Sequence, residues 1–181
     1  MTIRQLCTIP VAAFALIFSV GCMNHHAHVD RAIAVMTPTQ GNNVRGTVEF
    51  HKADNGVRVV ASITGLTPGD HGFHIHHWGD ITAADGTATG GHFDPFGHDH
   101  GARDADVKHI GDLGNLSADR NGVATYDWTD PDMSIALIIG RGVIIHAEPD
   151  DYGQPTGNAG ARVAQGVIGV AKPAEGHGHD H

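Results

Sequence analysis

Residues 71–80 read HGFHIHHWGD, and this stretch places four histidines directly before a Trp-Gly-Asp turn. Side chains on a β-strand alternate between its two faces, so an extended segment points His74 and His76 to one side and His77 to the other. The stretch therefore predicts a strand that can present one pair of histidines, His74 and His76, to a single metal ion.

Seven other short runs have the same β-rich character, and turn clusters such as ADNG at 53–56, TPGD at 67–70 and DRNG at 119–122 separate them. The runs are AIAVM (32–36), VRGTVEFH (44–51), VRVVASITGL (57–66), GVATYDW (122–128), MSIALIIG (133–140), GVIIHAE (142–148) and ARVAQGVIGVA (161–171). No long amphipathic helix accompanies them. The pattern predicts an all-β protein with eight antiparallel strands in a barrel or sandwich.

Two long irregular stretches, 79–112 and 147–161, interrupt these runs. Loops of that length inside one compact domain are usually functional. A chain of 181 residues with a removable leader predicts one domain. Its formal net charge of −9 gives no basic field, so we expect no nucleic-acid partner.

The first 22 residues read MTIRQLCTIPVAAFALIFSVGC, with a basic start, an apolar run and a small-residue end. This arrangement predicts a signal peptide, and hence an exported protein of the periplasm or cell envelope. The end SVGC resembles the bacterial lipoprotein box, in which Cys22 becomes the lipidated mature N-terminus and anchors the protein to a membrane. Ordinary cleavage near Gly21, which leaves Cys22 as a free thiol, is the alternative.

The remaining chain divides into a His-containing segment (23–31), a folded domain (32–172) and a His-rich tail (173–181). The two cysteines, Cys7 and Cys22, lie in the leader and at its end. The folded domain therefore cannot contain an internal disulfide, although we expect it to be exported to a compartment where disulfides persist.

The stretch 90–112, GGHFDPFGHDHGARDADVKHIGD, holds most of the remaining candidates for metal ligation: His92, His98, His100, His109 and Asp112. Imidazole suits copper and zinc, and three imidazoles with one carboxylate suit a tetrahedral zinc site. A Ser-His-Asp hydrolase is a competing interpretation, but the chain has no GxSxG motif. For His51 and His71, a surface or core role without chemistry is the simpler interpretation.

Five motifs then show a resemblance to a known family: GFHIH (72–76), GGHFDP (90–95), KHIGDLGN (108–115), VIIHAEPDDYG (143–153) and GNAGARVAQGVIGVA (157–171). In this order and with these separations, the chain resembles the copper/zinc superoxide dismutases. The resemblance covers nearly the whole domain and implies a Greek-key β-barrel with two functional loops.

The resemblance also implies the site. Copper would be held by His74, His76, His92 and His146. Zinc would be held by His92, His100, His109 and Asp112, so that His92 bridges the two ions. Asp150 matches an aspartate that ties a copper ligand to a zinc ligand, and Arg162 matches the arginine that attracts the anionic substrate. His98 is off register and receives no role.

The chain departs from the family pattern at two places. The family's intrasubunit disulfide would join positions 86 and 165, which are Gly86 and Gln165 here. The loop 147–161 has no lysine, whereas relatives use lysines there to steer superoxide. We therefore expect stronger dependence on zinc for loop structure and weaker electrostatic guidance of the substrate.

The resemblance implies an enzyme that dismutates superoxide to O₂ and H₂O₂, with copper and zinc as cofactors. A non-catalytic copper- or zinc-binding or metal-delivery protein on the same fold is the alternative, because a fold does not secure chemistry. We expect membrane contact only through the lipid anchor at Cys22. The sequence leaves open whether the chain is a monomer or a homodimer.

Overall fold

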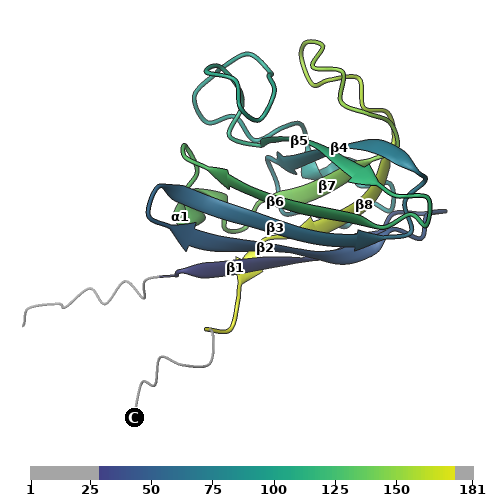
Figure 1. Cartoon of the computed structure of the whole chain (residues 1–181), viewed down its shortest axis with the longest axis horizontal. Helices are drawn as coiled ribbons and strands as arrows, with labels where there is room; N and C mark the ends of the chain where they lie inside the picture. The colour runs from purple at the N-terminus through teal and green to yellow at the C-terminus, as the bar shows by residue number, and fades with distance from the viewer. Residues whose placement is uncertain (1–28, 174–181) are drawn as a thin grey trace, which may run out of the picture.

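Antiparallel strands form one closed β-barrel in the computed structural model, which describes residues 29–173 (Figure 1). The strands are β1 (Arg31–Pro38), β2 (Arg45–Ala53), β3 (Gly56–Thr64), β4 (Gly69–His76), β5 (Asp112–Ala118), β6 (Ala124–Asp130), β7 (Gly142–His146), β8 (Arg162–Val167) and β9 (Gly169–Val170). Eight of them follow the order β2-β3-β6-β5-β4-β7-β8-β1, and pairing of β1 with β2 closes the barrel. The short β9 extends the pairing of β1. The predicted all-β barrel is thus confirmed.

Three predictions fall outside the described residues. They are the leader 1–22 with Cys22, most of the segment 23–31, and nearly all of the tail 173–181. Between residues 29 and 173, no helix is long and apolar enough to cross a membrane.

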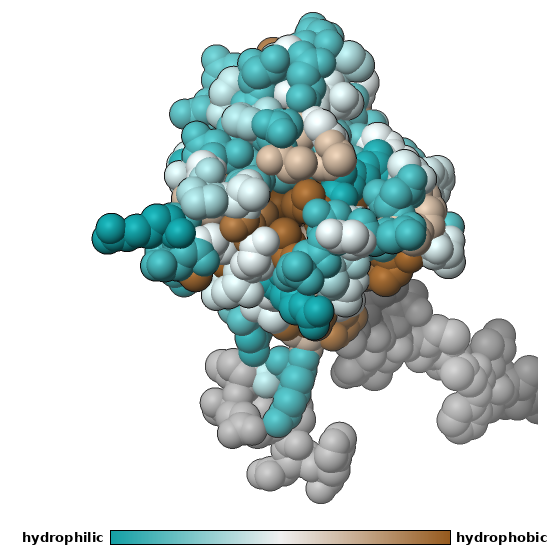
Figure 2. Space-filling view, turned by 90° about the vertical axis from the view of Figure 1, so that its right-hand side faces the viewer, coloured by the Kyte–Doolittle hydropathy of each residue, from teal (hydrophilic) through white to brown (hydrophobic). Residues whose placement is uncertain are grey.

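The barrel interior follows from strict alternation along the strands. In β3, Val57, Val59, Ala61 and Ile63 are buried in the core, while the residues between them face outward. The turn between β2 and β3 needs Gly56, whose φ of +112° is strained for other residues. Figure 2 shows one face of the molecule, on which hydrophilic residues cover most of the surface and hydrophobic residues gather near the middle.

Strand β4 shows the same alternation, with histidines on its outer face. Phe73 and Ile75 are fully buried in the barrel core. His74 and His76 therefore point to the opposite side, where loops cover them. This arrangement confirms the shared face predicted for the two histidines.

One strand assignment made from the sequence was wrong, and one strand was missed. The run 133–140 contains a short helix, α1 (Ile135–Ile138), and its apolar side chains close one end of the barrel. A short continuous apolar run has no periodicity that separates strand from helix. Conversely, β5 was not predicted, because Gly114 and a bulge beside it hide the alternation. Leu113 and Leu116 of β5 are nonetheless fully buried.

Both long irregular stretches are present and project from the same side of the barrel (Figure 1). The first connects β4 to β5 and contains a single 3-10 turn, η1 (Thr87–Thr89). The second connects β7 to β8 over residues 147–161. The candidate site lies where these two loops meet the outer face of β4 and β7.

Candidate metal centre

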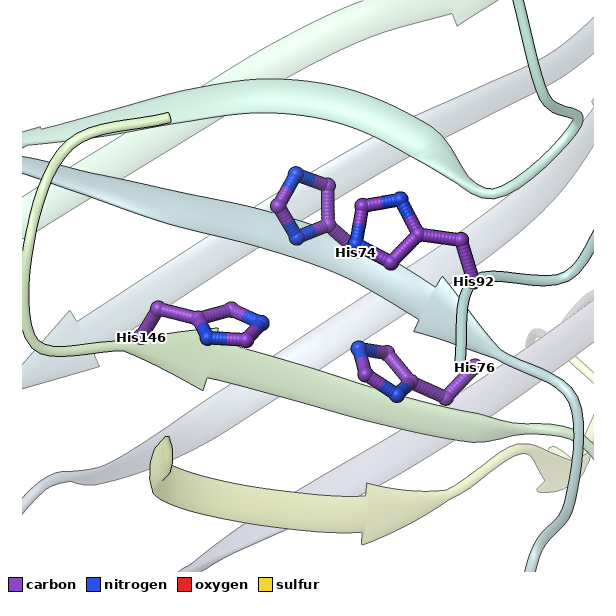
Figure 3. Close-up of side chains that lie close together, drawn as sticks. All are labelled: His74, His76, His92 and His146. Carbon is purple, nitrogen blue, oxygen red and sulfur yellow. The ribbon is translucent and has the colours of Figure 1, made fainter. Parts of the chain in front are cut away.

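Four imidazole rings converge on the outer face of the barrel (Figure 3). His74 and His76 come from β4, and His146 comes from the end of β7. His92 comes from the loop between β4 and β5, where its backbone makes an isolated β-bridge with His76. The ring centroids of His74 and His92 lie 3.9 Å apart, and those of His76 and His146 lie 5.7 Å apart. Each ring offers one nitrogen to a group in which the nitrogens lie within 4.8 Å of one another.

Irregular strand pairing occurs next to two of these rings, those of His74 and His146. The register of β7 against β8 shifts between Ile145 and His146, and that of β4 against β5 shifts between Gly72 and His74. Such bulges re-aim a side chain relative to the regular pleat. The two shifts lie at or beside rings of the cluster.

In three of the rings, one nitrogen makes a hydrogen bond and the other has no hydrogen-bond partner. The bonded contacts are His74 Nε2 with Asp150 Oδ2 (2.8 Å), His76 Nδ1 with the Gly90 carbonyl (2.8 Å) and His146 Nδ1 with the Gly160 carbonyl (3.2 Å). The opposite nitrogens, His74 Nδ1, His76 Nε2 and His146 Nε2, are buried without a hydrogen-bond partner. Buried polar atoms are normally paired, so three buried nitrogens that lie close together without a hydrogen-bond partner are suited to bind one ion. The set fits a metal ion that prefers nitrogen ligands.

A second cluster lies beside the first and shares His92. Asp112 Oδ1 lies 2.9 Å from His92 Nδ1, 3.0 Å from His100 Nδ1 and 3.2 Å from His109 Nδ1. The His100 and His109 nitrogens approach this oxygen without hydrogen-bond geometry. Three imidazoles and one carboxylate directed at a common point are a tetrahedral donor set of the kind that zinc prefers.

The second carboxylate oxygen of Asp112 is held by the backbone. Asp112 Oδ2 accepts hydrogen bonds from the N–H groups of Gly101 (3.1 Å) and His109 (2.8 Å). These bonds fix the carboxylate, so that Oδ1 stays directed at the three rings.

Asp150 joins the two clusters. Its Oδ2 atom accepts from His74 Nε2, and its Oδ1 atom accepts from His100 Nε2 across 3.0 Å. The side chain of Asn115 fixes the backbone of this aspartate, because it accepts from the Asp150 N–H (2.7 Å) and donates to the Asp150 carbonyl (3.0 Å). The structure therefore gives Asp150 the contacts predicted for it with His74 and His100.

Three contacts that sequence reasoning missed hold the loop that carries His100 and His109. The Gln154 side chain pairs with the backbone of His100. Lys108 Nζ donates to Asp130 Oδ2 across 2.9 Å in a buried ion pair. The Arg103 guanidinium lies 4.6 Å from the centre of the Trp128 ring. No local pattern indicates these pairs, because each one joins residues far apart in the chain.

Burial and charge set the protonation states of the rings. Burial lowers the pKa of His74 to about 3 and that of His146 to about 4, and it also lowers the pKa values of His76 and His92. The rings of the first cluster are therefore neutral near pH 7 and able to ligate a metal.

His100 differs from the rings of the first cluster. Burial lowers its pKa, but the adjacent carboxylates of Asp112 and Asp150 outweigh this effect and raise the pKa to about 9. Burial raises the pKa of both carboxyl groups, but hydrogen bonds with histidines overcome it and hold both pKa values below their usual range. Without a metal, a proton on His100 balances these carboxylates.

The other histidines of residues 29–173 lie outside both clusters. His98 Nδ1 contacts the Lys108 carbonyl, and the His77 ring packs against Trp78. His71 lies in β4, and its two nitrogens lie 2.8 Å from the carbonyls of His146 and Thr67. It is a buried structural residue that supports the β7 end.

Comparison with known proteins agrees with this geometry. The family described as copper/zinc superoxide dismutase (SODC) matches residues 44–168. The chain belongs to the copper/zinc superoxide dismutase family. The crystal structure of the clock protein EA4 is also similar, with a TM-score of 0.72 and 42% sequence identity over 78% of this chain and 95% of that one.

Arg162 lies beside the first cluster of this superoxide dismutase-family chain. It lines, with His76, His92 and His146, a hollow of about 380 Å³ that opens to solvent. Its guanidinium donates to the Gly90 carbonyl across 2.7 Å and to Thr89 Oγ1 across 3.0 Å. These bonds hold a positive charge at the mouth of the site, where it can attract a small anion.

Neither position of the family disulfide carries a thiol. Gly86 has a φ of +80°, and its carbonyl accepts a hydrogen bond from Arg162. Gln165 is buried on β8, and its side chain reaches the loop between β4 and η1. The structure thus places both residues where the loop meets β8.

Proposed function

We propose that this protein dismutates superoxide at a copper ion held by His74, His76, His92 and His146. A zinc ion would be held by His92, His100, His109 and Asp112. The observation that carries the proposal is the set of buried ring nitrogens without hydrogen-bond partners, each on a ring whose other nitrogen is fixed. This arrangement supports two adjacent metal sites that share one imidazole.

The overall reaction consumes two superoxide ions and two protons and yields O₂ and H₂O₂. Copper supplies the one-electron chemistry, while zinc is redox-inert and orients ligands. Arg162 binds the anion at the mouth of the hollow. His92 turns Nδ1 toward Asp112, which leaves Nε2 on the side of the first cluster, where it can hold a proton and give it to the reduced product. Asp150 keeps His74 and His100 oriented.

Elemental analysis combined with superoxide turnover on the protein without its leader tests the proposal. We expect one copper and one zinc per chain, with rapid turnover that His146→Gln abolishes together with copper binding. His51→Gln is the matched control, because His51 lies on β2 beside Glu49, away from both clusters. A copper-loaded protein without turnover would refute the proposal.

A non-catalytic metal-binding or metal-delivery role is the second candidate. The observation in its favour is that a structural relative of 42% identity is described as a clock protein rather than as an enzyme. Such a role predicts bound copper without dismutation, together with copper transfer to an apo acceptor. The turnover assay above separates the two functions.

We also propose that the protein is exported and anchored in the cell envelope through lipidated Cys22. The sequence of residues 1–22 supports this proposal. Cell fractionation and intact mass of the wild type and of Cys22→Ala test it, since only the wild type should carry acyl chains and sediment with membranes. Solution mass measurement distinguishes a monomer from a homodimer.

A further inference from the structure

The loop segment 81–90 lies against β8, and side chains of β8 hold its carbonyl oxygens. Gln165 Nε2 donates to the Ala83 carbonyl across 3.2 Å and approaches the Ile81 carbonyl at 3.5 Å. One residue further along, the Ala84 carbonyl accepts from the backbone N–H of Gln40 across 2.7 Å. The first half of this segment is thus fixed from two sides.

Arg162 holds the second half of the same segment. It donates to the carbonyls of Gly86 and Gly90, and to Thr89 Oγ1. The Gly90 carbonyl in turn faces His76 Nδ1 at 2.8 Å, so its position sets the orientation of that ring. A shift of the loop would therefore change the direction in which His76 presents its free nitrogen.

Gln165 is well placed to hold the loop. Only 5% of the residue is exposed, and its backbone pairs with Ile144 of β7 and with Thr37 of β1. Its Oε1 atom is buried and has no hydrogen-bond partner within the described part of the chain. Because one end of the amide is bonded and the other is not, its net effect on stability is small. Its bonded end still specifies where the loop lies.

Gly86 does not favour a covalent bridge to this strand. It adopts a left-handed conformation with φ of +80°, and a Cβ atom there would lie 3.2 Å from Arg162 Cδ. A cysteine at this position would be strained and would crowd Arg162. No covalent bond joins Gly86 to Gln165, and hydrogen bonds attach this part of the loop to β8.

We propose that Gln165 is a positioning residue whose Nε2–H group fixes the loop 81–90, and through the Gly90 carbonyl the orientation of His76. The attachment contains no sulfur, so thiol reductants do not release it. The proposed role of Gln165 in holding the loop does not depend on the proposed function. The expected change in the Cu(II) spectrum, described below, rests on that function.

Hydrogen exchange of the zinc-loaded protein tests the loop without any need for copper or turnover. In Gln165→Met, which keeps the size and removes the donor, we expect amides of residues 81–90 to exchange at least tenfold faster. The melting temperature should stay within about 5 °C of the parent value. The matched control is Gln40→Met, since the exposed Gln40 side chain lies next to the same loop and should leave exchange unchanged.

Gln165→Glu separates the donor from packing when exchange is measured at a pH where the glutamate is ionised, because a carboxylate retains the shape and has no hydrogen to donate. It should loosen the loop at least as much as Gln165→Met, and in copper-loaded protein both variants should change the Cu(II) spectrum. Parent-like exchange in both variants would overturn the proposal. Loosening in Gln165→Met alone would also overturn it, because side-chain packing rather than the donor would then hold the loop.

Discussion

The side-chain amide of Gln154 pairs with both backbone groups of His100. The His100 N–H donates to Gln154 Oε1 across 3.1 Å, and Gln154 Nε2 donates to the His100 carbonyl across 2.8 Å. The amide thereby imitates one step of a β-ladder and fastens the loop 147–161 to a residue of the second cluster.

Removing this pairing should weaken zinc binding. In Gln154→Leu, the His100 backbone loses both partners while its imidazole stays intact, so we expect the zinc dissociation constant to rise about tenfold. Competition with a chromogenic chelator measures it, with Gln40→Leu as the exposed control. Unchanged affinity would show that the His100 ring is oriented by Asp112 and Asp150 alone.

The Asp150 carboxylate should matter to both metal sites. Asp150→Asn retains one acceptor oxygen and replaces the other with a donor, so either His74 or His100 loses its acceptor. We expect affinity for both copper and zinc to fall about 10–100-fold. Asp151→Asn is the control, because Asp151 is exposed and its carboxylate accepts hydrogen bonds from Gly153 and Asn158. A loss confined to one metal would contradict the bridging role.

Without metals, the free energy of unfolding should pass through a maximum near pH 6.5. His74 and His146 have folded pKa values of about 3 and 4, below the ordinary 6.5. The unfolded chain therefore binds more protons than the folded chain in this interval, and stability rises with pH until about 6.5. His100 has the opposite sign: its pKa of about 9 stabilises the fold below pH 6.5, and that contribution is lost between pH 6.5 and 9.

Urea unfolding of EDTA-treated protein at pH 4.5, 6.5 and 9 measures this dependence. The zinc-loaded protein is the control, and it should lose the alkaline decline because the metal replaces the proton on His100. An apo protein that is more stable at pH 9 than at pH 6.5 would contradict the assignment of His100.

Zinc removal should lower the melting temperature strongly. The loop that carries His100 and His109 lacks a disulfide, so the metal contributes much of its order. Zinc at 1,000 times its dissociation constant adds about 4 kcal/mol, and each kcal/mol shifts the melting temperature of a domain of this size by about 2–4 °C. We expect EDTA-treated protein to melt about 10 °C lower in calorimetry. A difference of only a few degrees would contradict the dependence on zinc.

The catalytic rate constant should depend only weakly on salt. Among the described residues that line the hollow, Arg162 is the single permanently cationic side chain, and the adjoining loop 147–161 has no lysine. We expect at most about a twofold fall in rate between 20 and 200 mM salt. Asn158→Lys, on the rim of the hollow, should raise the rate at low salt and steepen its dependence. A steep fall in the parent would refute the prediction.

Sequence patterns predicted the parts of the fold in which one face of a strand is buried. The alternation around His74 and His76 was correct because Phe73 and Ile75 must enter the core. The assignment of 133–140 as a strand failed because Ile135 and Ile138 are buried from a single helical turn. Strand β5 was missed because a glycine in the left-handed conformation breaks its pattern.

The resemblance to a family predicted which residues gather at the two clusters, and the structure brings all seven of them together with Asp150. The supporting residues could not be predicted in this way. Gln154, Gln165 and Lys108 act through partners 54, 82 and 22 residues away. A carboxamide or an ammonium group has no spacing rule that reveals such a partner.

The alternation along β4 also bears on whether this strand pairs in the correct register. A slip of one residue against β5 and β7 would bring imidazoles into the barrel and expose Phe73 and Ile75. The same slip would dismantle the first cluster, because His74 and His76 would face away from His146. Under the proposed function, a bound metal ion would therefore stabilise the correct strand register selectively, since only a correctly paired barrel could retain it.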